Sequence, residues 1–335
     1  MTDILSYLFS DWGEMFKQIL VPLDGSELAE CVIPHALAIA KVFGARLILI
    51  RVLDRSRETV QMRPFDSLSW HMNVAEAMAY LEGKADLFRK GDVETTCEVL
   101  EGSSAERIIQ YTQTKPVDLI ILSSHGLSGV GGWSVSSVVQ QILLRILIPA
   151  MIIRAHGGII EQDIELSYQN IFVPLDMSQR AECALPVAIR IARKHRSLLF
   201  PAHVVSKPEM PRLGPVSQED EELSQRIVDR NFDEASKYIE QLKNRLQAED
   251  LDIQPLLFIC ENTAVRLHQL VDENNIDLVV LSAHGYTSHA HWPIGSIVSN
   301  FMNFGKTPLL VLQDMPKEAL RSQLYENQVE QKKGH

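Results

Sequence analysis

Residues 19–34 read ILVPLDGSELAECVIP, and residues 171–186 read IFVPLDMSQRAECALP. In both stretches a short apolar run ends at an Asp, and the residues that follow suit the start of a helix. The likeness continues later in each half, where VDLIILSSHG (117–126) matches IDLVVLSAHG (276–285). Self-similarity over such a distance indicates a duplicated structural unit. The sequence therefore predicts two copies of one fold.

The length of the chain agrees with a duplication. A chain of 335 residues is too long for one ordinary hydrophobic core and suggests two domains of roughly 150 residues each. The second copy is longer in its middle, around the polar stretch KPEMPRLGPVSQEDEE (207–222). We expect five segments: an N-terminal extension (1–15), a first domain (16–155), a linker (156–167), a second domain (168–314) and a C-terminal tail (315–335).

Each copy alternates strand-like and helix-like segments. ARLILIRVL (45–53) is nearly continuous in apolar residues, which is typical of a parallel strand covered by helices on both faces. Asp24 and Gly25 end the first strand, and Ser26 is a suitable N-cap for one helix that extends to about Phe43. The alternation predicts an α/β fold in which each domain is a doubly wound parallel sheet with right-handed crossovers.

Composition and charge exclude several classes of function. Apolar residues make up 46% and charged residues 22% of the chain, which is an ordinary globular balance. The net charge of −11 argues against binding to nucleic acid and against docking on an anionic membrane. The apolar runs are far shorter than the ~20 residues of a membrane helix, and the start lacks a secretory signal, so we expect a cytoplasmic protein. The four Cys show no CxxC or zinc-site spacing, so we expect reduced thiols.

The carboxyl ends of the strands are the expected ligand site, because ligands bind there in doubly wound sheets. Three parts of each copy meet at this edge: the turn at Asp24 or Asp176, the strand end at Val52 or Val204, and a loop rich in Gly and Ser. A Gly lets backbone amides approach a phosphate closely, and a Ser at the following helix start adds a hydroxyl. The two loops read SSHGLSGVGGWSVSS (123–137) and SAHGYTSHAHWPIGS (282–296).

The ordered set VPLDGS, DLIILSSHG, the Gly/Ser loop and the last strands PAMIIR and TPLLVL resembles the universal stress protein family in its tandem, two-domain form. The resemblance covers about residues 16–155 and 168–314. It implies two Rossmann-like five-stranded sheets with the strand order 3-2-1-4-5. It also implies that the two halves pair edge to edge through PAMIIR and TPLLVL as a pseudo-two-fold pair. Some members of the family bind ATP through Gly, two residues, Gly, nine residues, Gly and then Ser or Thr. In those members the strand-one Asp holds the ribose or adenine region, and a strand-two Val contacts the adenine.

The family's ATP-binding pattern is incomplete in both halves of this chain. The second half has Ser282 in place of the first of three Gly, and the first half has Ser123 and Ser136 in place of the first and third. A Ser at a position that needs positive φ would cost roughly 1 kcal/mol or more. In the second half the implied nucleotide-binding residues are Pro174, Leu175, Asp176, Val204, Ser282, His284, Gly285, Gly295, Ser296 and Ile297. In the first half the weaker set is Pro22, Leu23, Asp24, Val52, Ser123, His125, Gly126, Ser136, Ser137 and Val138.

Several of these residues could also have purely structural roles. Asp24 and Asp176 could be only turn formers or helix caps at strand ends. His125 and His284 have no nucleophile pattern around them, so we interpret them as residues that order the loop. Glu261 stands where the first half has Gly102, and its carboxylate would repel phosphates if it faced the site.

Two further features of the loops are weak indications of function. His289 and His291 lack a third ligand, so we predict no metal site and no catalytic residue. Trp133 and Trp292 occupy equivalent positions, and packing of the loop explains them better than base stacking does.

The resemblance implies a cytoplasmic stress-response protein that binds ATP, with or without Mg²⁺, in at least one domain and acts as a sensor or regulatory module. Its expected partners are the nucleotide, its own second half, a homodimeric copy and a protein of unknown identity, with no nucleic acid and no membrane. Two alternatives stay open: a nucleotide-free scaffold of the same fold, which the Ser-for-Gly changes favour, and a slow ATPase. The chain has no Walker GxxxxGK[ST] lysine, so backbone amides would hold the phosphates and hydrolysis would be weak at most.

Overall fold

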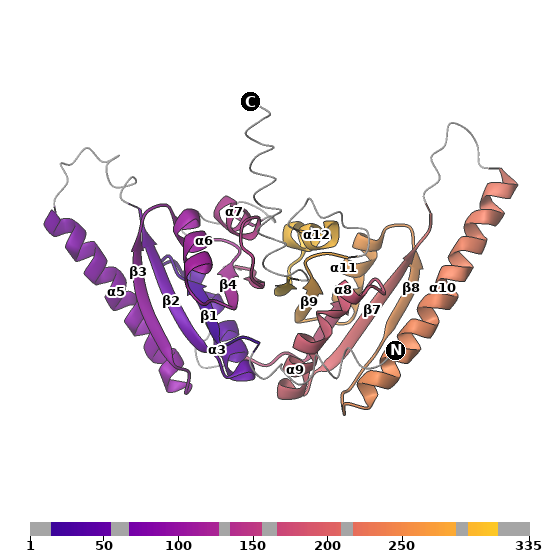
Figure 1. Cartoon of the computed structure of the whole chain (residues 1–335), viewed down its shortest axis with the longest axis horizontal. Coiled ribbons are helices and arrows are strands. Elements are labelled where there is room, and N and C mark those ends of the chain that lie inside the picture. The colour runs from indigo at the N-terminus through magenta and orange to yellow at the C-terminus, as the bar shows by residue number, and fades with distance from the viewer. Residues whose placement is uncertain are drawn as a thin grey trace.

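The computed structural model describes residues 15–54, 67–126, 135–155, 166–208, 217–285 and 294–313. We refer to the described residues up to 155 as unit 1 and to those from 166 onward as unit 2. Figure 1 shows the units as two similar halves of one molecule, with α7 of unit 1 facing α12 of unit 2 across the middle. Within these described residues, no helix combines the length and the apolar character needed to cross a membrane.

Unit 1 alternates strands and helices. Its elements are β1 (Gln18–Pro22), α2 (Glu27–Glu30), α3 (Val32–Phe43), β2 (Arg46–Leu53), α5 (Ser67–Lys90), β3 (Thr95–Glu101), α6 (Ser104–Thr114), β4 (Leu119–Ser123), α7 (Ser137–Leu143) and β5 (Ala150–Ile153).

Unit 2 repeats this order. Its elements are β6 (Asn170–Pro174), α8 (Gln179–Glu182), α9 (Leu185–His195), β7 (Leu198–Ser206), α10 (Gln218–Gln247), β8 (Leu256–Cys260), α11 (Thr263–Glu273), β9 (Leu278–Ser282), α12 (Ser296–Phe304) and β10 (Leu309–Leu312).

The first helix of each unit is split in two, where the sequence predicts one continuous helix from Ser26. In unit 1 the break falls at Cys31, between α2 and α3, and Pro34 lies in the first turn of α3. Proline has no N–H and its ring clashes with the carbonyl four residues earlier, so it is tolerated only near a helix start. Pro186 lies at the second position of α9 for the same reason. The expectation of one helix was therefore wrong, and the recurring proline explains why.

The strands form one ten-stranded sheet in the order β3-β2-β1-β4-β5-β10-β9-β6-β7-β8. Neighbouring strands within each unit are parallel. The units join where β5 and β10 pair in antiparallel orientation, with Met151 opposite Leu310. The α/β fold and the pairing of the two halves are thus confirmed, and the two expected sheets merge into a single one.

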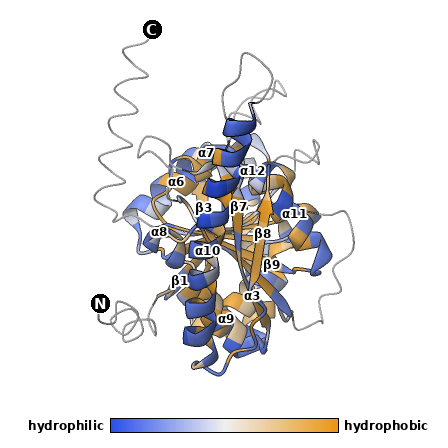
Figure 2. Cartoon of the chain, turned by 90° about the vertical axis from the view of Figure 1, so that its right-hand side faces the viewer, coloured by the Kyte–Doolittle hydropathy of each residue, from blue (hydrophilic) through white to orange (hydrophobic). Residues whose placement is uncertain are grey.

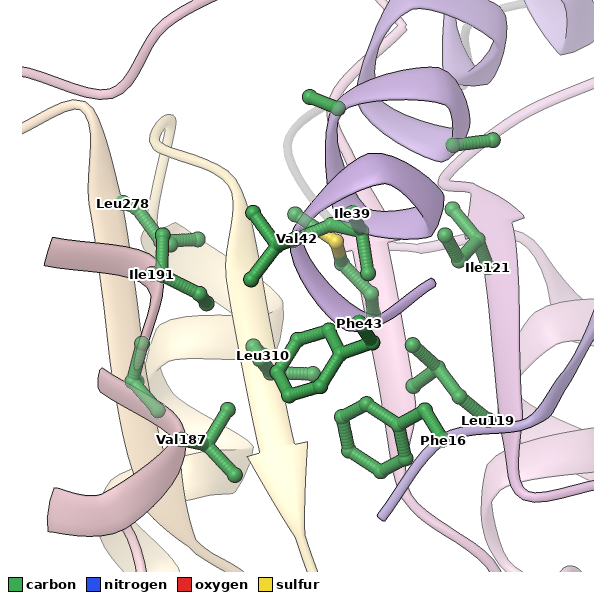
Figure 3. Close-up of a cluster of buried hydrophobic side chains, with 14 of the residues drawn as sticks. Phe16, Ile39, Val42, Phe43, Leu119, Ile121, Val187, Ile191, Leu278 and Leu310 are labelled. Atoms are coloured by element: carbon green, nitrogen blue, oxygen red, sulfur yellow. The ribbon is translucent and has the colours of Figure 1, made fainter. Parts of the chain in front are cut away.

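Alternate residues of each strand face opposite sides of the sheet, so two apolar layers form. On β1, Ile19 lies in one layer and Leu20 in the other. Figure 3 shows the first layer, in which Phe43 of unit 1 lies beside Leu310 of β10, with Ile191 of α9 beyond it. Both layers contain residues of both units, so the units share a continuous core.

The outer helices shield this core from water. Figure 2 shows strands such as β7 and β8 as hydrophobic and the long α10 as largely hydrophilic on the outside. On α10 the buried side chains include Val228, Ala235 and Ile239, which recur at helical spacing along one face. The sheet is therefore covered as the apolar strand pattern requires.

A buried polar cluster joins the units beneath the sheet junction. His35 Nδ1 lies 2.8 Å from the hydroxyl of Tyr168, whose ring stacks on His195 at a centroid distance of 5.4 Å. The amide of Tyr168 also donates to Nδ1 of His195 (2.9 Å). In unit 1 the equivalent positions hold Phe16 and Phe43, which pack edge to face. Burial lowers the pKa of His35 to about 4, so this histidine is neutral at ordinary pH.

Two arginines hold helix ends across the interface. Arg154 follows β5 of unit 1 and donates to the carbonyl oxygens of Phe301 (2.8 Å) and Met302 (2.6 Å) in α12. Arg190 of unit 2 donates from Nε to the carbonyl oxygen of Val42 in α3 (3.1 Å). The last carbonyls of a helix lack a full set of partners within the helix, so each unit supplies donors to a helix end of the other.

Candidate functional site

The turns after β1 and β6 have the same hydrogen-bond pattern. Asp24 Oδ1 accepts hydrogen bonds from the amide (3.0 Å) and hydroxyl (2.6 Å) of Ser26. Asp176 Oδ1 accepts the equivalent bonds from Ser178 (3.0 and 2.5 Å). Each serine oxygen in turn accepts an amide hydrogen from the first turn of α2 or α8, at 3.1 Å. One carboxylate oxygen of each Asp therefore organises the helix start, which is the structural role that the sequence left open.

The second carboxylate oxygen meets the loop that follows β4 or β9. A Cβ placed on Gly126 would overlap Oδ2 of Asp24, and a Cβ on Gly285 would overlap Oδ2 of Asp176. Neither glycine has a positive φ, so close approach explains these glycines and backbone conformation does not. The structure thus brings together two motifs that are about a hundred residues apart in each unit.

The serines that replace the first glycine of the ATP-binding pattern are buried and hydrogen-bonded. The hydroxyl of Ser123 lies 2.7 Å from the carbonyl oxygens of His125 and Leu28, and that of Ser282 donates to the carbonyl oxygen of His284 (2.6 Å). Neither serine has a positive φ. The strain that the sequence suggested for these replacements is therefore absent, and each serine stabilises the turn that leaves its strand.

The third position of the pattern differs between the units. Ser136 is the N-cap of α7, and its hydroxyl oxygen accepts from the amide of Val139 at 3.4 Å. Gly295 is the N-cap of α12, and no side chain caps that helix. Both have extended backbones, with φ −61° and −70°, so neither position requires glycine for its φ. A Cβ on Gly295 would lie 3.1 Å from the carbonyl oxygen of Ala283. Only unit 2 therefore starts this helix with uncapped amides.

The strand-two valines lie on one face of the sheet with the residues that follow the helix-start serines. Val52 and Val138 of unit 1, and Val204 and Ile297 of unit 2, all pack in the second apolar layer. The exposed hydroxyl-bearing residues Ser137 and Ser296 precede Val138 and Ile297 in the chain. Each unit thus places an apolar patch beside a polar helix start.

The residues just before each Asp serve the core. Pro22 and Pro174 end β1 and β6. Leu23 and Leu175 are buried in the first apolar layer, opposite to the valines, and their amides donate to the second strand of their unit at 2.8 Å. Their side chains therefore belong to the packing, and only their backbone borders the predicted site.

Histidines 125 and 284 are both buried in the loops that leave β4 and β9. Nδ1 of His125 lies 3.1 Å from the hydroxyl of Ser124, which also accepts from the amide of Ala155 (3.0 Å). In the described part of the chain, no group of three His, Cys, Asp or Glu could hold a metal. Four residues that the sequence singled out lie outside the described residues: Trp133, His289, His291 and Trp292.

The carboxylate of Glu261 does not face inward. Its side chain is 83% exposed and lies 3.6 Å from Nζ of Lys207. Its counterpart Gly102 has a φ of 131°, a conformation that favours glycine. The expected repulsion of phosphates by Glu261 therefore finds no support in its position.

Sequence reasoning missed the side chains that flank the two Asp turns. In unit 1 the guanidinium of Arg51 lies over Gly25, 3.0 Å from where a Cβ would be. In unit 2 the equivalent residue is His203, which is buried and donates from Nδ1 to the carbonyl oxygen of Leu175 (2.8 Å). Met177 replaces Gly25 and takes a φ of 66°, which is strained for a non-glycine residue. A charged residue inside the apolar run RLILIRVL was the available signal for Arg51.

Each unit also places a tyrosine of its long outer helix near the Asp turn. Tyr80 donates to Oε1 of Glu30 (2.9 Å), and Arg51 lies over its ring at 5.2 Å. Burial, together with the Glu30 carboxylate, raises the pKa of Tyr80. Burial and the carboxylate of Glu182 raise the pKa of Tyr238 in the same way. Both tyrosines therefore stay protonated, and Tyr80 acts as a donor to Glu30.

Comparison with known proteins places these features in a family. The family model described as "Universal stress protein family" matches the chain twice, over residues 15–154 and 167–313. A universal stress protein of Methanocaldococcus jannaschii is 26% identical over 159 residues, which are 45% of this chain and 89% of that protein. One of Thermus aquaticus is 28% identical over 143 residues, which are 42% of this chain and 100% of that protein. Each of these relatives corresponds in length to about one unit.

Solved structures match both units at once. A universal stress protein from Archaeoglobus fulgidus superposes with a TM-score of 0.61 at 16% identity, covering 90% of this chain and 97% of the other. One from Pseudomonas aeruginosa has a TM-score of 0.59 at 13% identity, with coverages of 94% and 99%. At these identities the likeness concerns the fold alone.

Proposed function

Because the chain belongs to the universal stress protein family, we propose that unit 2 binds an adenine nucleotide, ATP, and that the protein acts as a stress-related sensor or regulatory module. One observation carries this proposal. The start of α12 at Gly295 has no side-chain cap, and the amide of Gly295 is bonded to the loop in which Gly285 meets Asp176. An uncapped helix start and a carboxylate thus flank the same loop.

The helix start suits the phosphates. The first amides of a helix have no partner within the helix, and the helix dipole adds a partial positive charge. The α12 helix has nine residues, and its first residue, Ser296, exposes a hydroxyl. Phosphate oxygens would accept hydrogen bonds from these groups, and Mg²⁺ would accompany the phosphates as a counterion.

The opposite end of the nucleotide suits the Asp turn. The carboxylate of Asp176 would accept hydrogen bonds from ribose hydroxyls, and its Oδ1 contact with Ser178 holds it in place. Val204 and Ile297 supply apolar surface for a base. These roles agree with those that the family pattern implies for the same positions.

Unit 1 has a different role in this proposal. The hydroxyl of Ser136 already occupies an amide at the start of α7, which has only seven residues. We therefore propose that unit 1 serves mainly as the structural partner of unit 2, which keeps part of the scaffold alternative. A protein partner would distinguish unit 2 with bound nucleotide from unit 2 without it.

The proposal is tested by calorimetric titration of the full chain with ATP and Mg²⁺. We expect one binding event per chain. Gly295→Ser should weaken it roughly fivefold or more, because a serine cap competes with phosphate at a cost of about 1 kcal/mol. The matched control is Ser136→Gly, which makes the reverse change at the equivalent position of unit 1. It should leave the affinity of unit 2 for ATP unchanged.

The possible results separate the alternatives. No heat and no thermal shift at millimolar ATP would refute nucleotide binding and support the scaffold. Binding that Ser136→Gly strengthens and Gly295→Ser leaves unchanged would move the site to unit 1. Release of phosphate at well above one turnover per minute, lost in Asp176→Asn, would identify an enzyme.

A further inference from the structure

Arg154 of unit 1 makes a charged contact with the helix of the proposed nucleotide site in unit 2. The antiparallel pairing of β5 with β10, in which Ile152 lies opposite Leu309, places the residue after β5 beside the segment that joins α12 to β10. From there Nη2 of Arg154 donates to the carbonyl oxygens of Phe301 (2.8 Å) and Met302 (2.6 Å). The end of α12 is therefore held by a side chain of the other unit.

The guanidinium of Arg154 suits this helix end in two respects. It is half-buried, and burial lowers its pKa, so its charge is partly removed from water. A hydrogen bond from a charged donor is roughly twice as strong as one between neutral groups. The positive charge also lies at the negative end of the helix dipole. Arg154 therefore stabilises the last turn of α12 both by hydrogen bonds and by its charge.

The equivalent position of unit 2 holds an uncharged residue, Gln313. Gln313 follows β10 as Arg154 follows β5. Its Oε1 is buried and has no hydrogen-bond partner among the described residues. A carbonyl at a helix end accepts hydrogen bonds and cannot donate to this oxygen. The pseudo-symmetric position in unit 2 thus lacks the charge with which Arg154 holds a helix end.

The helices that these two residues could reach also end differently. Figure 1 shows α7 and α12 facing each other across the middle of the molecule. In α7 the carbonyl oxygen of Ile142 accepts the backbone amides of Arg145 and Ile146 (both 3.0 Å). In α12 the equivalent carbonyl, that of Phe301, accepts the amide of Gly305 (2.9 Å) and the guanidinium from unit 1. The backbone of unit 1 supplies the end of α7, whereas the end of α12 uses a donor from its partner unit.

The α12 helix is short, so a contact at its end bears on its start. It has nine residues, and isolated helices of fewer than about 12 residues are marginal in water. The amide of Ser299 closes its first turn by donating to the carbonyl oxygen of Gly295 (3.0 Å). Phe301, which Arg154 contacts, follows two residues later. Anything that loosens the last turn of α12 therefore acts next to the turn that carries the uncapped amides.

From this geometry we infer that Arg154 is a positioning residue for the nucleotide site of unit 2, because it fixes the helix whose first amides would bind the phosphates. The inference rests on the proposed function of unit 2. The affinity of that site depends on the contact with unit 1. Nucleotide binding in turn strengthens the pairing of the units, since coupling between two binding events is reciprocal.

The first test is calorimetric titration of the full chain with ATP and Mg²⁺, well below the melting temperature of each variant. Arg154→Gln, which copies Gln313, should weaken binding roughly threefold or more. Arg154→Lys keeps a charged donor and should bind ATP more tightly than Arg154→Gln. The matched control is Arg190→Gln, because Arg190 also crosses between the units and donates to a helix-end carbonyl, that of Val42. The control should leave the affinity unchanged.

The second test needs no nucleotide. Hydrogen exchange at the amide of Ser299 reports opening of the first turn of α12. Its counterpart in α7 is the amide of Gln140, which donates to the carbonyl oxygen of Ser136 (2.9 Å). Arg154→Gln should speed exchange at Ser299 roughly threefold or more and leave exchange at Gln140 unchanged. A merely structural role would lower the melting temperature and speed exchange at both amides alike, without changing the affinity for ATP.

The outcomes separate this inference from the proposed function. Absence of ATP binding by the wild type would refute the proposed function and the inference with it. Wild-type binding that Arg154→Gln leaves unchanged would overturn the inference alone. Equal losses of affinity in Arg154→Gln and Arg190→Gln would also overturn it, because general loosening of the paired units would then be the cause. Unchanged exchange at Ser299 in Arg154→Gln would show that this arginine does not act through α12.

Discussion

The two units share the Asp turn and differ at the helix that faces it. Asp24 and Asp176 make the same pair of hydrogen bonds, and both meet a glycine of the neighbouring loop. The helix that follows is capped by Ser136 in unit 1, whereas Gly295 leaves it uncapped in unit 2. The Asp turn recurs in both units because it organises the start of a helix in each of them. In the proposed function, ligand binding depends on the position at which the two units differ, Ser136 in unit 1 and Gly295 in unit 2.

The interface differs between the units in the same way. Unit 2 contributes the polar pair Tyr168 and His195, where unit 1 has Phe16 and Phe43. His35 of unit 1 meets Tyr168, whereas its counterpart in unit 2 is Val187. A donor and an acceptor that meet only when unlike units pair favour the internal pairing over pairing of like units.

The largest expected effect concerns pH and this polar cluster. His35 has a pKa near 6.5 when unfolded and about 4 when folded, so the unfolded chain binds its proton first as the pH falls. The free energy of unfolding should fall by about 3 kcal/mol between pH 7 and pH 4 from this group alone. Urea unfolding at several pH values measures the effect.

The control for the pH effect copies the residues of the other unit. His35→Val/Tyr168→Phe copies two of the three cluster positions and leaves His195 in place, so the free energy of unfolding of the variant should fall by about 3 kcal/mol less between pH 7 and pH 4 than that of the wild type. Equal pH slopes in the two proteins would show that His35 does not couple protonation to folding.

The next largest effect breaks the shared Asp–Gly contact. Gly126→Ala and Gly285→Ala each place a methyl group on a carboxylate oxygen, so each should lower the free energy of unfolding by about 2 kcal/mol. Only Gly285→Ala should also abolish the binding of ATP. Thermal unfolding and calorimetry on both variants measure the two properties separately. Loss of ATP binding in Gly126→Ala alone would reverse the assignment of the units.

The smallest effect concerns the caps that the units share. Ser26→Ala and Ser178→Ala each remove a hydroxyl that accepts an amide at the start of α2 or α8. Each should cost about 1 kcal/mol, and the two costs should agree closely because the geometry is the same. Denaturant unfolding measures both. A much larger cost for one serine would show that the turns are less alike than their hydrogen bonds indicate.

Several features could be predicted from the sequence because they depend on neighbouring residues. The repeat and the apolar runs predicted two α/β units, while the pairing of the last strands, seen between β5 and β10, was implied by the family resemblance. The N-cap role of Ser26 also followed from its place after a strand. The break at Cys31 could have been predicted too, since Pro34 follows it, but the helical pattern concealed it.

Other features could not be predicted, because distant residues create them. The contact of Asp176 with Gly285 forms only when β6 and β9 lie side by side. The place of Arg51 over Gly25 depends on the pairing of β1 with β2, and the exposure of Glu261 depends on its loop. Ser123 and Ser282 showed no strain only once their backbone angles were known.

The sequence by itself determined the duplication, the type of each segment and the residue types offered at each strand end, since these follow from the spacing of apolar residues, prolines and caps along the chain. The tertiary structure alone decided that Arg154 of unit 1 reaches the end of α12 and that His35 of unit 1 meets Tyr168 of unit 2. Such features require that the units pack through β5 and β10, because side chains remote in sequence come together only after the sheet has closed.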